Sequence, residues 1–217
     1  MENNMISFAG VRHPDIPYYL AKLLAGDGRQ ILLIDNSELH DLFSSLHMDE
    51  EDRTYGETAI GNIHCLKDIA YSKKAFDKFD YVIVYHGFDI DSTIWNESNG
   101  RYLMVNTDRY LLKLVRDRMI GEKSTSLSLL ILDAYFEKLD EEDIAELLTL
   151  NTDDIRGVFT LPFDPVDMST LQSFQFNGMQ SVNKLSSAMK MLLHEIYNDL
   201  FGETNKRAFK RVLEMAD

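Results

Sequence analysis

Apolar residues are grouped in short continuous runs, and segments with helical periodicity lie between them. The runs that predict strands are residues 5–9, 30–35, 58–66, 81–84, 102–105, 128–132 and 155–161. Most of these runs are almost continuously apolar, which is typical of strands buried on both faces of a sheet. Helices are predicted for residues 16–25, 109–120, 140–148 and 183–201, and shorter or more polar helical segments for 37–52 and 72–79. Residues 170–176 form a further short segment, for which no type of element is predicted. Strands that alternate with helices predict an α/β fold, in which a mostly parallel central sheet lies between two layers of helices.

The chain of 217 residues is long enough for one domain with a substantial core. No internal repeat, low-complexity segment or long linker divides it. Hydrophobic residues make up 45% of the chain and charged residues 27%, which is ordinary for a globular protein. We therefore expect a single domain over residues 1–217, with a C-terminal helical tail over residues 183–217.

The net charge of −14 argues against a nonspecific nucleic-acid surface, which needs clustered lysines and arginines. One short basic segment, 206–211, stands apart from this acidic background. Together with the residues up to 215, it forms a cationic and partly amphipathic helical pattern. Peripheral contact with a membrane is therefore an alternative, but the acidic bulk of the protein opposes binding to anionic lipid. We expect a surface helix, or a helix that packs on a partner.

Cys65 is the only cysteine, so an intramolecular disulfide is excluded and a reducing compartment is favoured. The first residues lack the basic flank and apolar core of a secretion signal. No stretch approaches the roughly 20 apolar residues of a membrane-spanning helix. These observations predict a cytoplasmic protein. The six histidines are scattered without ligand spacing, so no metal site is predicted.

The first strand, the helix and the second strand form a βαβ opening, whose first loop is Gly10-Val-Arg-His-Pro14. In α/β proteins a phosphate group commonly binds at this place, against backbone N–H groups at the start of the helix. Such a loop needs glycines that close around the phosphate, a lysine, and a serine or threonine hydroxyl for magnesium. Of these features, the loop has one glycine, Gly10. A plain strand-to-helix turn is the alternative, since Pro14 suits the first turn of a helix.

The segment from Phe8 to Pro14 resembles the loop of the MinD/ParA-like P-loop ATPases of the SIMIBI class, which has the form Lys-Gly-Gly-Val-Gly-Lys-Thr. Laid on that pattern without a gap, Phe8 stands at the first lysine, Val11 matches, and Arg12 replaces a glycine. His13 stands at the P-loop lysine and Pro14 at the threonine. The length of the loop agrees with the family, and its chemistry does not.

Other segments resemble the same family in their order and spacing. Residues 79–87, Phe-Asp-Tyr-Val-Ile-Val-Tyr-His-Gly, are similar to its second acidic strand, and Tyr85 takes the place of an aspartate that helps to hold magnesium and water. Residues 103–108 and 155–164 are similar to the ends of two later strands of the family. Asp35 is retained from the first acidic strand, whereas Ser37 stands where a second aspartate is frequent. The resemblance covers nearly the whole chain and implies the P-loop NTPase fold, a Rossmann-like three-layer sandwich.

These departures predict a degenerate nucleotide or anion site at the carboxyl ends of the strands. Its residues are Gly10, Val11, Arg12, His13, Asp35, Tyr85 and His86. Because the lysine, the hydroxyl and two aspartates are replaced, the resemblance implies no hydrolysis and no required cofactor. Arg12 and His13 leave weak binding of ATP or another anion open. An active ATPase with an atypical P-loop is the alternative that keeps enzymatic activity.

A Rossmann-like nucleotide or small-molecule binding protein is a further alternative. Asp35 ends the second strand of the βαβ opening, and the length of this unit suits a dinucleotide-binding fold in which an acidic residue binds the ribose. The fingerprint Gly-x-Gly-x-x-Gly requires three glycines, however, and the loop supplies Gly10 alone. Tyr135 and Lys138 are one residue too close for the Tyr-x-x-x-Lys pair of short-chain dehydrogenases.

The resemblance also implies a function. Members of the family position or assemble cellular structures and switch partners through a nucleotide-bound dimer, so protein partners are expected here. TadZ/CpaE-like pilus-localisation proteins tolerate atypical P-loops and are the nearest named comparison. They point to a positioning, assembly or scaffold factor for a pilus or another bacterial surface or secretion apparatus.

Aromatic residues predict where a partner would bind. Phe8, Tyr18, Tyr85 and Phe88 lie on or near the P-loop edge, at which the family dimerises. Large apolar side chains without charges suit a buried contact. We therefore expect a nucleotide-independent homodimer or a heteromeric contact through this face. The alternative is that Phe8 and Tyr18 fill the vacated nucleotide pocket.

Overall fold

The computed structural model describes residues 4–46, 50–70, 72–119, 126–134, 141–177 and 181–216. Its strands are β1 (Asn4–Gly10), β2 (Ile31–Asp35), β3 (Glu57–Ile60), β4 (Ile63–Lys67), β5 (Tyr81–Tyr85), β6 (Gly100–Asn106), β7 (Leu127–Ala134) and β8 (Ile155–Pro162). In this part of the chain they form one sheet in the order β3-β4-β2-β5-β1-β6-β7-β8. Neighbouring strands run parallel, except β3 and β4, which are antiparallel.

Helices connect these strands and continue beyond the last one. They are α1 (Asp15–Gly26), α2 (Asp41–Ser44), α3 (Glu50–Tyr55), α4 (Lys73–Phe76), α5 (Ser92–Glu97), α6 (Arg109–Met119), α7 (Glu141–Leu148), α8 (Pro165–Asn177), α9 (Ser187–Phe201) and α10 (Lys206–Met215). Short 3-10 helices lie at Thr152–Asp154 and Val182–Lys184.

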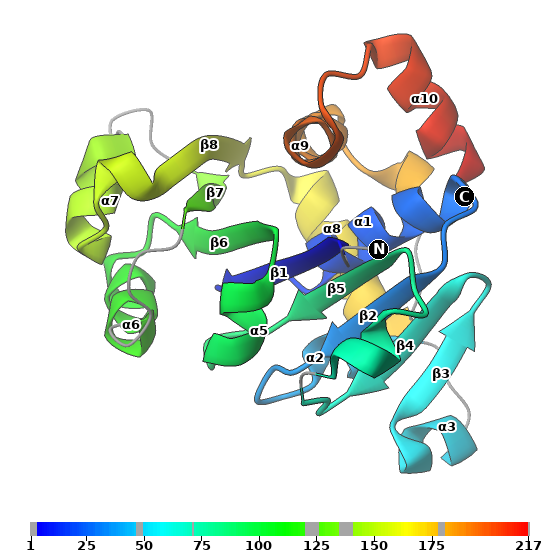
Figure 1. Ribbon diagram of the computed structural model, residues 1–217. Coiled ribbons are helices and arrows are strands. Elements are labelled where there is room, and N and C mark those ends of the chain that lie inside the picture. The colour runs from blue at the N-terminus through cyan, green and yellow to red at the C-terminus, as the bar shows by residue number, and fades with distance from the viewer. Residues whose placement is uncertain are drawn as a thin grey trace.

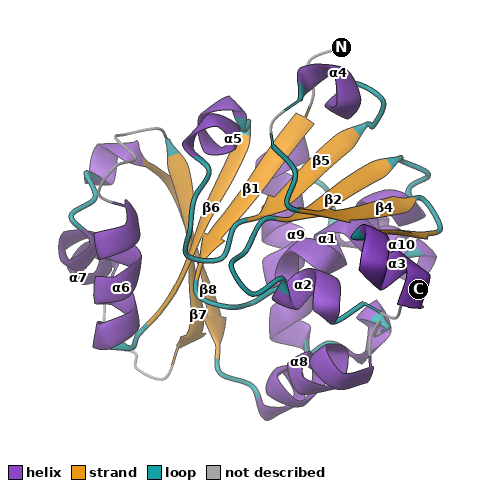
Figure 2. Ribbon diagram, turned by 90° about the horizontal axis from the view of Figure 1, so that it is seen from below, coloured by secondary structure: helices purple, strands orange, loops and turns teal. Residues whose placement is uncertain are grey.

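Helices cover both faces of the sheet (Figure 1 and Figure 2). The larger core joins the sheet to α1, α8 and α9, and includes Leu20, Phe174 and Leu193 from these helices. The smaller core joins Phe76 of α4 and Ile94 of α5 to the other face of β1, β2 and β5. Strands β2 and β5 are buried along their whole length, because a helical layer lies over each of their faces. The predicted three-layer α/β sandwich with a mostly parallel sheet is confirmed.

Some predicted elements have different boundaries in the structure. Residues 58–66, predicted as one strand, form the hairpin of β3 and β4, because Gly61 has a φ of +58° and turns the chain back. The helix predicted over 183–201 begins at Ser187, where the Ser186 hydroxyl caps it by accepting a hydrogen bond from the N–H of Met189 at 3.0 Å. The short segment predicted at 170–176 is the second half of α8. Residues 47–49, 120, 135–140 and 217, which carry parts of other predictions, lie outside the described residues.

Helix α10, at the end of the predicted helical tail, packs against α1. Phe209 and Val212 are buried, and the rings of Phe209 and His194 of α9 have centroids 4.4 Å apart. The apolar side of this cationic helix is therefore covered by its own chain, which agrees with the first expectation, a surface helix. In the described part of the chain, no helix is long and apolar enough to cross a membrane.

Gly10, the last residue of β1, gives a test of this packing. Its φ is +114°, and a Cβ atom built on it would lie 2.0 Å from the carbonyl oxygen of Met104 in β6. Gly10→Ala should therefore lower the free energy of unfolding by about 3 to 5 kcal/mol, through backbone strain and the forced separation of β1 from β6. Urea unfolding followed by circular dichroism measures this loss.

Gly28→Ala is the matched control, because Gly28 also has a positive φ, +80°, but a Cβ atom added to it would have no other atom within 4 Å. Gly28→Ala should lower the free energy of unfolding by about 1 to 2 kcal/mol. Equal losses for the two variants would contradict the close approach of β1 and β6.

Candidate functional site

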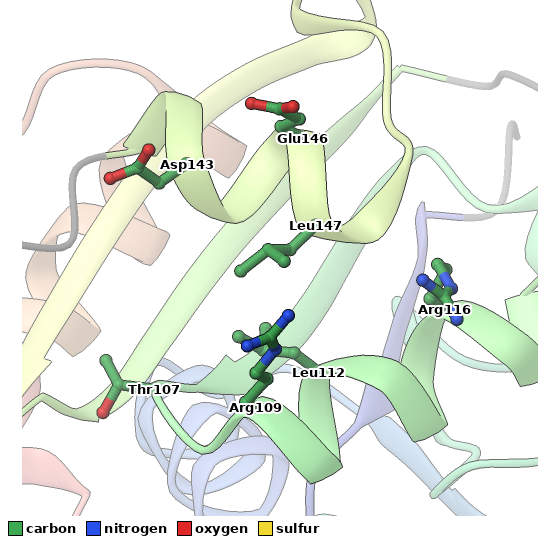
Figure 3. Close-up of a pocket in the computed structure, with 7 residues that line it drawn as sticks. All are labelled: Thr107, Arg109, Leu112, Arg116, Asp143, Glu146 and Leu147. Carbon is green, nitrogen blue, oxygen red and sulfur yellow. The ribbon is translucent and has the colours of Figure 1, made fainter.

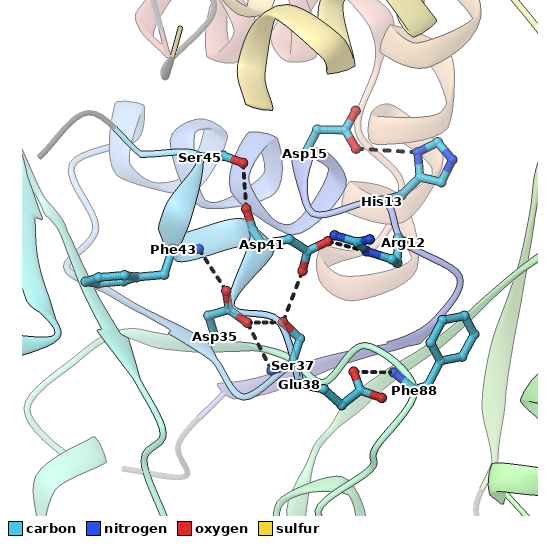
Figure 4. A network of polar contacts seen from close by, with 10 residues as sticks. All are labelled: Arg12, His13, Asp15, Asp35, Ser37, Glu38, Asp41, Phe43, Ser45 and Phe88. Carbon is cyan, nitrogen blue, oxygen red and sulfur yellow. Dashed lines mark hydrogen bonds and ion pairs between the residues drawn. The ribbon is translucent and has the colours of Figure 1, made fainter. Parts of the chain in front are cut away.

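The residues predicted to form a site lie at the carboxyl edge of β1, β2 and β5. Figure 4 shows Arg12, His13 and Asp35 among them. Asp35, the last residue of β2, is in register with Tyr85, the last residue of β5. Tyr85 is also in register with Phe8 of β1, two residues before Gly10. The parallel order of the strands thus brings Asp35, Tyr85 and the loop after β1 together, at the edge where such sheets commonly bind ligands.

The loop between β1 and α1 uses backbone N–H groups within the protein. The N–H of Gly10 donates to the carbonyl oxygen of Gly87 at 2.7 Å, and the N–H of Val11 donates to that of Met104 at 2.9 Å. The N–H of His13 donates to the carbonyl oxygen of Val11 at 3.0 Å. A phosphate cradle needs N–H groups that point at the anion. Because these three are already bonded, the loop has the geometry of a tight strand-to-helix turn.

The imidazole of His13 is buried between two carboxylates. Its Nε2 lies 3.1 Å from Oδ2 of Asp133 at the end of β7, in hydrogen-bond contact. Its Nδ1 lies 3.4 Å from Oδ1 of Asp15 in the first turn of α1, in an ion-pair contact. Burial by itself lowers the pKa of His13, but the two aspartates outweigh burial and raise the pKa to about 10. His13 is therefore a cation at neutral pH, and its charge is compensated inside the protein.

Arg12 is paired with an aspartate as well. Its Nε donates to Oδ2 of Asp41 at 2.9 Å, and Oδ1 of Asp41 accepts a hydrogen bond from Oγ of Ser37 at 3.0 Å (Figure 4). Four carboxylates thus accompany the two cations of this edge: those of Asp15, Asp35, Asp41 and Asp133. An added phosphate would meet an excess of negative charge here, which opposes its binding.

Asp35 holds the loop that follows its own strand. Its Oδ1 accepts hydrogen bonds from the N–H and the hydroxyl of Ser37, at 3.0 and 2.6 Å. Its Oδ2 accepts one from the N–H of Phe43 in α2, at 2.8 Å. Burial raises the pKa of Asp35 above its ordinary value, and these hydrogen bonds oppose that rise. Both oxygen atoms therefore bind the chain itself, which leaves Asp35 poorly placed to bind a ribose or a metal ion.

Tyr85 stands where the sequence resemblance expects an aspartate. Its side chain is fully buried, and its hydroxyl has no hydrogen-bond partner among the described residues. Burial raises the pKa of Tyr85 well above its ordinary value, and the charges of Asp41 and Asp35 raise it further. The phenol is therefore neutral and supplies no carboxylate for magnesium. Within the described ranges, no group of three or more His, Cys, Asp or Glu side chains could hold a metal ion.

The prediction of an aromatic contact surface at this edge is wrong for three of its four residues. Phe8, Tyr18 and Tyr85 are fully buried, so they belong to the core of the chain and are not available to a partner. The ring of Phe8, for example, stacks on that of Tyr102 in β6, with centroids 5.0 Å apart. Phe88 is partly exposed. The burial of Phe8 and Tyr18 agrees with the alternative in which aromatic side chains fill this space.

His86 is not part of the charged cluster, although it follows a strand at the same edge. Its Nδ1 accepts a hydrogen bond from the N–H of Asp91 at 3.3 Å, so its Nε2 carries the proton and donates to Oγ of Ser7 at 3.1 Å. Burial lowers the pKa of His86 to about 4, so the imidazole is neutral. Its contribution to stability is complete above about pH 6.5 and is lost as the pH falls toward 4. His86, predicted as a site residue, is therefore a structural residue beside α5.

Three carboxylates of this edge were not predicted from the sequence. Asp15 directly follows the loop, and its place in the first turn of α1 was the available signal, since negative charge is favourable there. Asp41 and Asp133 lie 29 and 120 residues from their partners, Arg12 and His13. The sequence around each residue does not indicate such a distant partner, because only the folded arrangement of the chain brings the two together.

Comparisons of sequence find no match: no protein-family model matches the chain, and no curated protein does. Comparison of structures finds several matches. MinD in a MinC:MinD cell division complex from Aquifex aeolicus is 17% identical, with a TM-score of 0.64 over 93% of this chain and 97% of that one. A ParA family ATPase from Chlorobium tepidum TLS is 14% identical, with a TM-score of 0.60 over 88% and 98%. The cell division ATPase MinD of Pyrococcus furiosus is 14% identical, with a TM-score of 0.60 over 92% and 100%.

The fold is that of the MinD and ParA ATPases. Within this MinD/ParA fold, the sequence pattern places His13 at the P-loop lysine. A lysine there would offer its charge to a phosphate, whereas the charge of His13 is compensated by Asp15 and Asp133. At this place in the fold, the charge of His13 is therefore held in ion pairs within the chain.

The charge of His13 predicts a pH dependence of stability. The pKa of His13 is about 10 in the folded protein and about 6.5 in the unfolded chain. The stabilisation that it provides is therefore complete below pH 6.5 and is lost as the pH rises to 10. The advantage of the wild type over His13→Gln in free energy of unfolding should shrink by up to about 1.4 kcal/mol for each pH unit in this window. Denaturant unfolding at several pH values measures it.

His64→Gln is the control, because His64 is exposed on β4 and lies away from this cluster. The difference in free energy of unfolding between the wild type and His64→Gln should change little over the same pH window. A constant difference between wild type and His13→Gln from pH 6.5 to 10 would show that His13 is not a buried cation.

Proposed function

We propose that this protein is a non-hydrolysing member of the MinD/ParA fold that acts through protein contacts, as a positioning, assembly or scaffold factor. The observation that supports this most strongly is the burial of His13 between Asp15 and Asp133. The solved structures of the same fold include cell division and partition proteins, and one of them is a complex of MinD with the protein MinC.

The chemistry of ATP hydrolysis supports the same proposal. Phosphoryl transfer needs a cation on the phosphates, a hydroxyl that holds magnesium, and groups that position the metal and the attacking water. In this chain the cation His13 is ion-paired, Pro14 has no hydroxyl, and Tyr85 is a buried neutral phenol. Binding the phosphates, holding magnesium and positioning the water would therefore each need a residue other than His13, Pro14 or Tyr85.

Two alternatives have less support from the contacts of the site. An active ATPase with an atypical P-loop would have to break the ion pairs of Arg12 and His13 before either could bind a phosphate. A Rossmann-like nucleotide-binding protein would use Asp35 for a ribose, but both oxygen atoms of Asp35 already accept hydrogen bonds.

The proposal predicts that Mg-ATP does not bind measurably. Isothermal titration should give no heat beyond dilution, because a phosphate would compete with Asp15, Asp41 and Asp133 for two cations. The melting temperature should also stay unchanged with about 5 mM Mg-ATP, whereas a ligand with a dissociation constant of about 10 μM would stabilise the protein by roughly 3.7 kcal/mol. Binding in the low micromolar range that Arg12→Ala or His13→Ala abolishes, and His64→Ala does not, would favour the active ATPase.

We propose that the protein associates constitutively, as a homodimer or with another protein, since no nucleotide would switch the contact. The TadZ/CpaE-like resemblance favours a bacterial pilus, or another surface or secretion apparatus, as the structure that it serves. The buried residues Phe8, Tyr18 and Tyr85 cannot form the contact, so a different surface must do so.

A constitutive contact predicts a molecular mass that is independent of nucleotide. Light scattering of the purified protein, alone or with its partner, should give the same mass with and without Mg-ATP at each protein concentration. A mass that increases when Mg-ATP is added would show a nucleotide-controlled dimer and would contradict this part of the proposal.

A further inference from the structure

Helices α6 and α7 lie side by side, at the end of the sheet that carries β7 and β8 (Figure 1). A groove of about 490 Å³ lies between them. Figure 3 shows Leu112 of α6 and Leu147 of α7 pointing toward each other across it. The two leucines give the groove an apolar floor.

The two walls of this groove carry opposite charges. Arg109 and Arg116 line it on α6, and Asp143 and Glu146 line it on α7. Arg116 is paired with its neighbour in sequence, Asp117, at 2.8 Å. In the described part of the chain, neither Arg109 nor Glu146 forms an ion pair. The charges of Arg109 and Glu146 therefore remain available to a molecule that lies in the groove.

The spacing of the arginines selects the shape of that molecule. Arg109 and Arg116 are seven residues apart on α6, which places their Cα atoms about 10 Å apart along the helix. A second helix presents side chains on one face at the same spacing, between positions i and i+7. An extended strand presents side chains on one face about 7 and 13 Å apart, and neither distance matches. A helix that lies along α6 therefore meets both arginines.

We propose that the α6–α7 groove binds an amphipathic helix of a partner protein. This helix places apolar side chains on Leu112 and Leu147, two carboxylates seven residues apart on Arg109 and Arg116, and a basic side chain near Glu146. Helix-in-groove binding of this kind draws its affinity from the apolar anchors, while the charges fix the orientation. The proposal does not depend on whether ATP binds elsewhere in the protein.

Two labelled peptides test this proposal on the full-length protein. Both are Ala-rich helices of about 18 residues with leucines along one face, a length at which an isolated helix forms in water. The first carries Glu at i and i+7 on one side of the leucines and Lys on the other. The second exchanges the Glu and Lys positions. Fluorescence anisotropy should show that the first peptide binds about tenfold more tightly than the second.

Charge reversal on the protein should reverse this preference. With Arg109→Glu and Arg116→Glu combined, the second peptide should bind more tightly than the first. Lys206→Glu combined with Arg207→Glu is the matched control, because it makes the same change in net charge on exposed residues of α10, and it should keep the original preference. Circular dichroism confirms that both variants fold. Equal binding of the two peptides, no binding of either, or a preference that Arg109→Glu and Arg116→Glu leave unchanged would overturn the proposal.

Discussion

The buried imidazolium of His13 is the group on which the carboxyl edge of β1, β2 and β5 depends. A charge that is removed from water is stable only when opposite charges or hydrogen bonds replace its hydration. Asp15 and Asp133 provide them, and they come from the start of α1 and the end of β7. The pairing therefore joins the start of α1 to the end of β7. A phosphate could gain the charge of His13 only by displacing a carboxylate.

The fold could be predicted from the sequence because its strongest signals are local. The apolar runs at 31–34 and 81–84 need helices on both faces, so their alternation with helical segments indicated a parallel sheet. Residues 58–66 were harder, because the turn at Gly61 depends on one positive φ within an otherwise strand-like segment. The position of the candidate site followed from the same reasoning, since the carboxyl ends of parallel strands lie at one edge.

The interactions within the site could not be predicted in the same way. An apolar pattern does not tell on which side of a buried strand a residue lies, so Phe8 and Tyr85 were expected at a contact surface and lie in the core. His86 was expected beside His13, but it bonds to Ser7. The pair of His13 and Asp133 spans 120 residues and depends on β6 lying between β1 and β7 in the sheet.

The central claim is that this edge is closed by the chain itself. Amide hydrogen exchange at Gly10, Val11 and His13 tests it most directly, because their N–H groups are bonded to Gly87, Met104 and Val11 in the described structure. We expect slow exchange at these three amides without nucleotide, and the same rates with Mg-ATP in large excess. Fast exchange that Mg-ATP slows would contradict the claim, because these N–H groups would then be free to receive a phosphate.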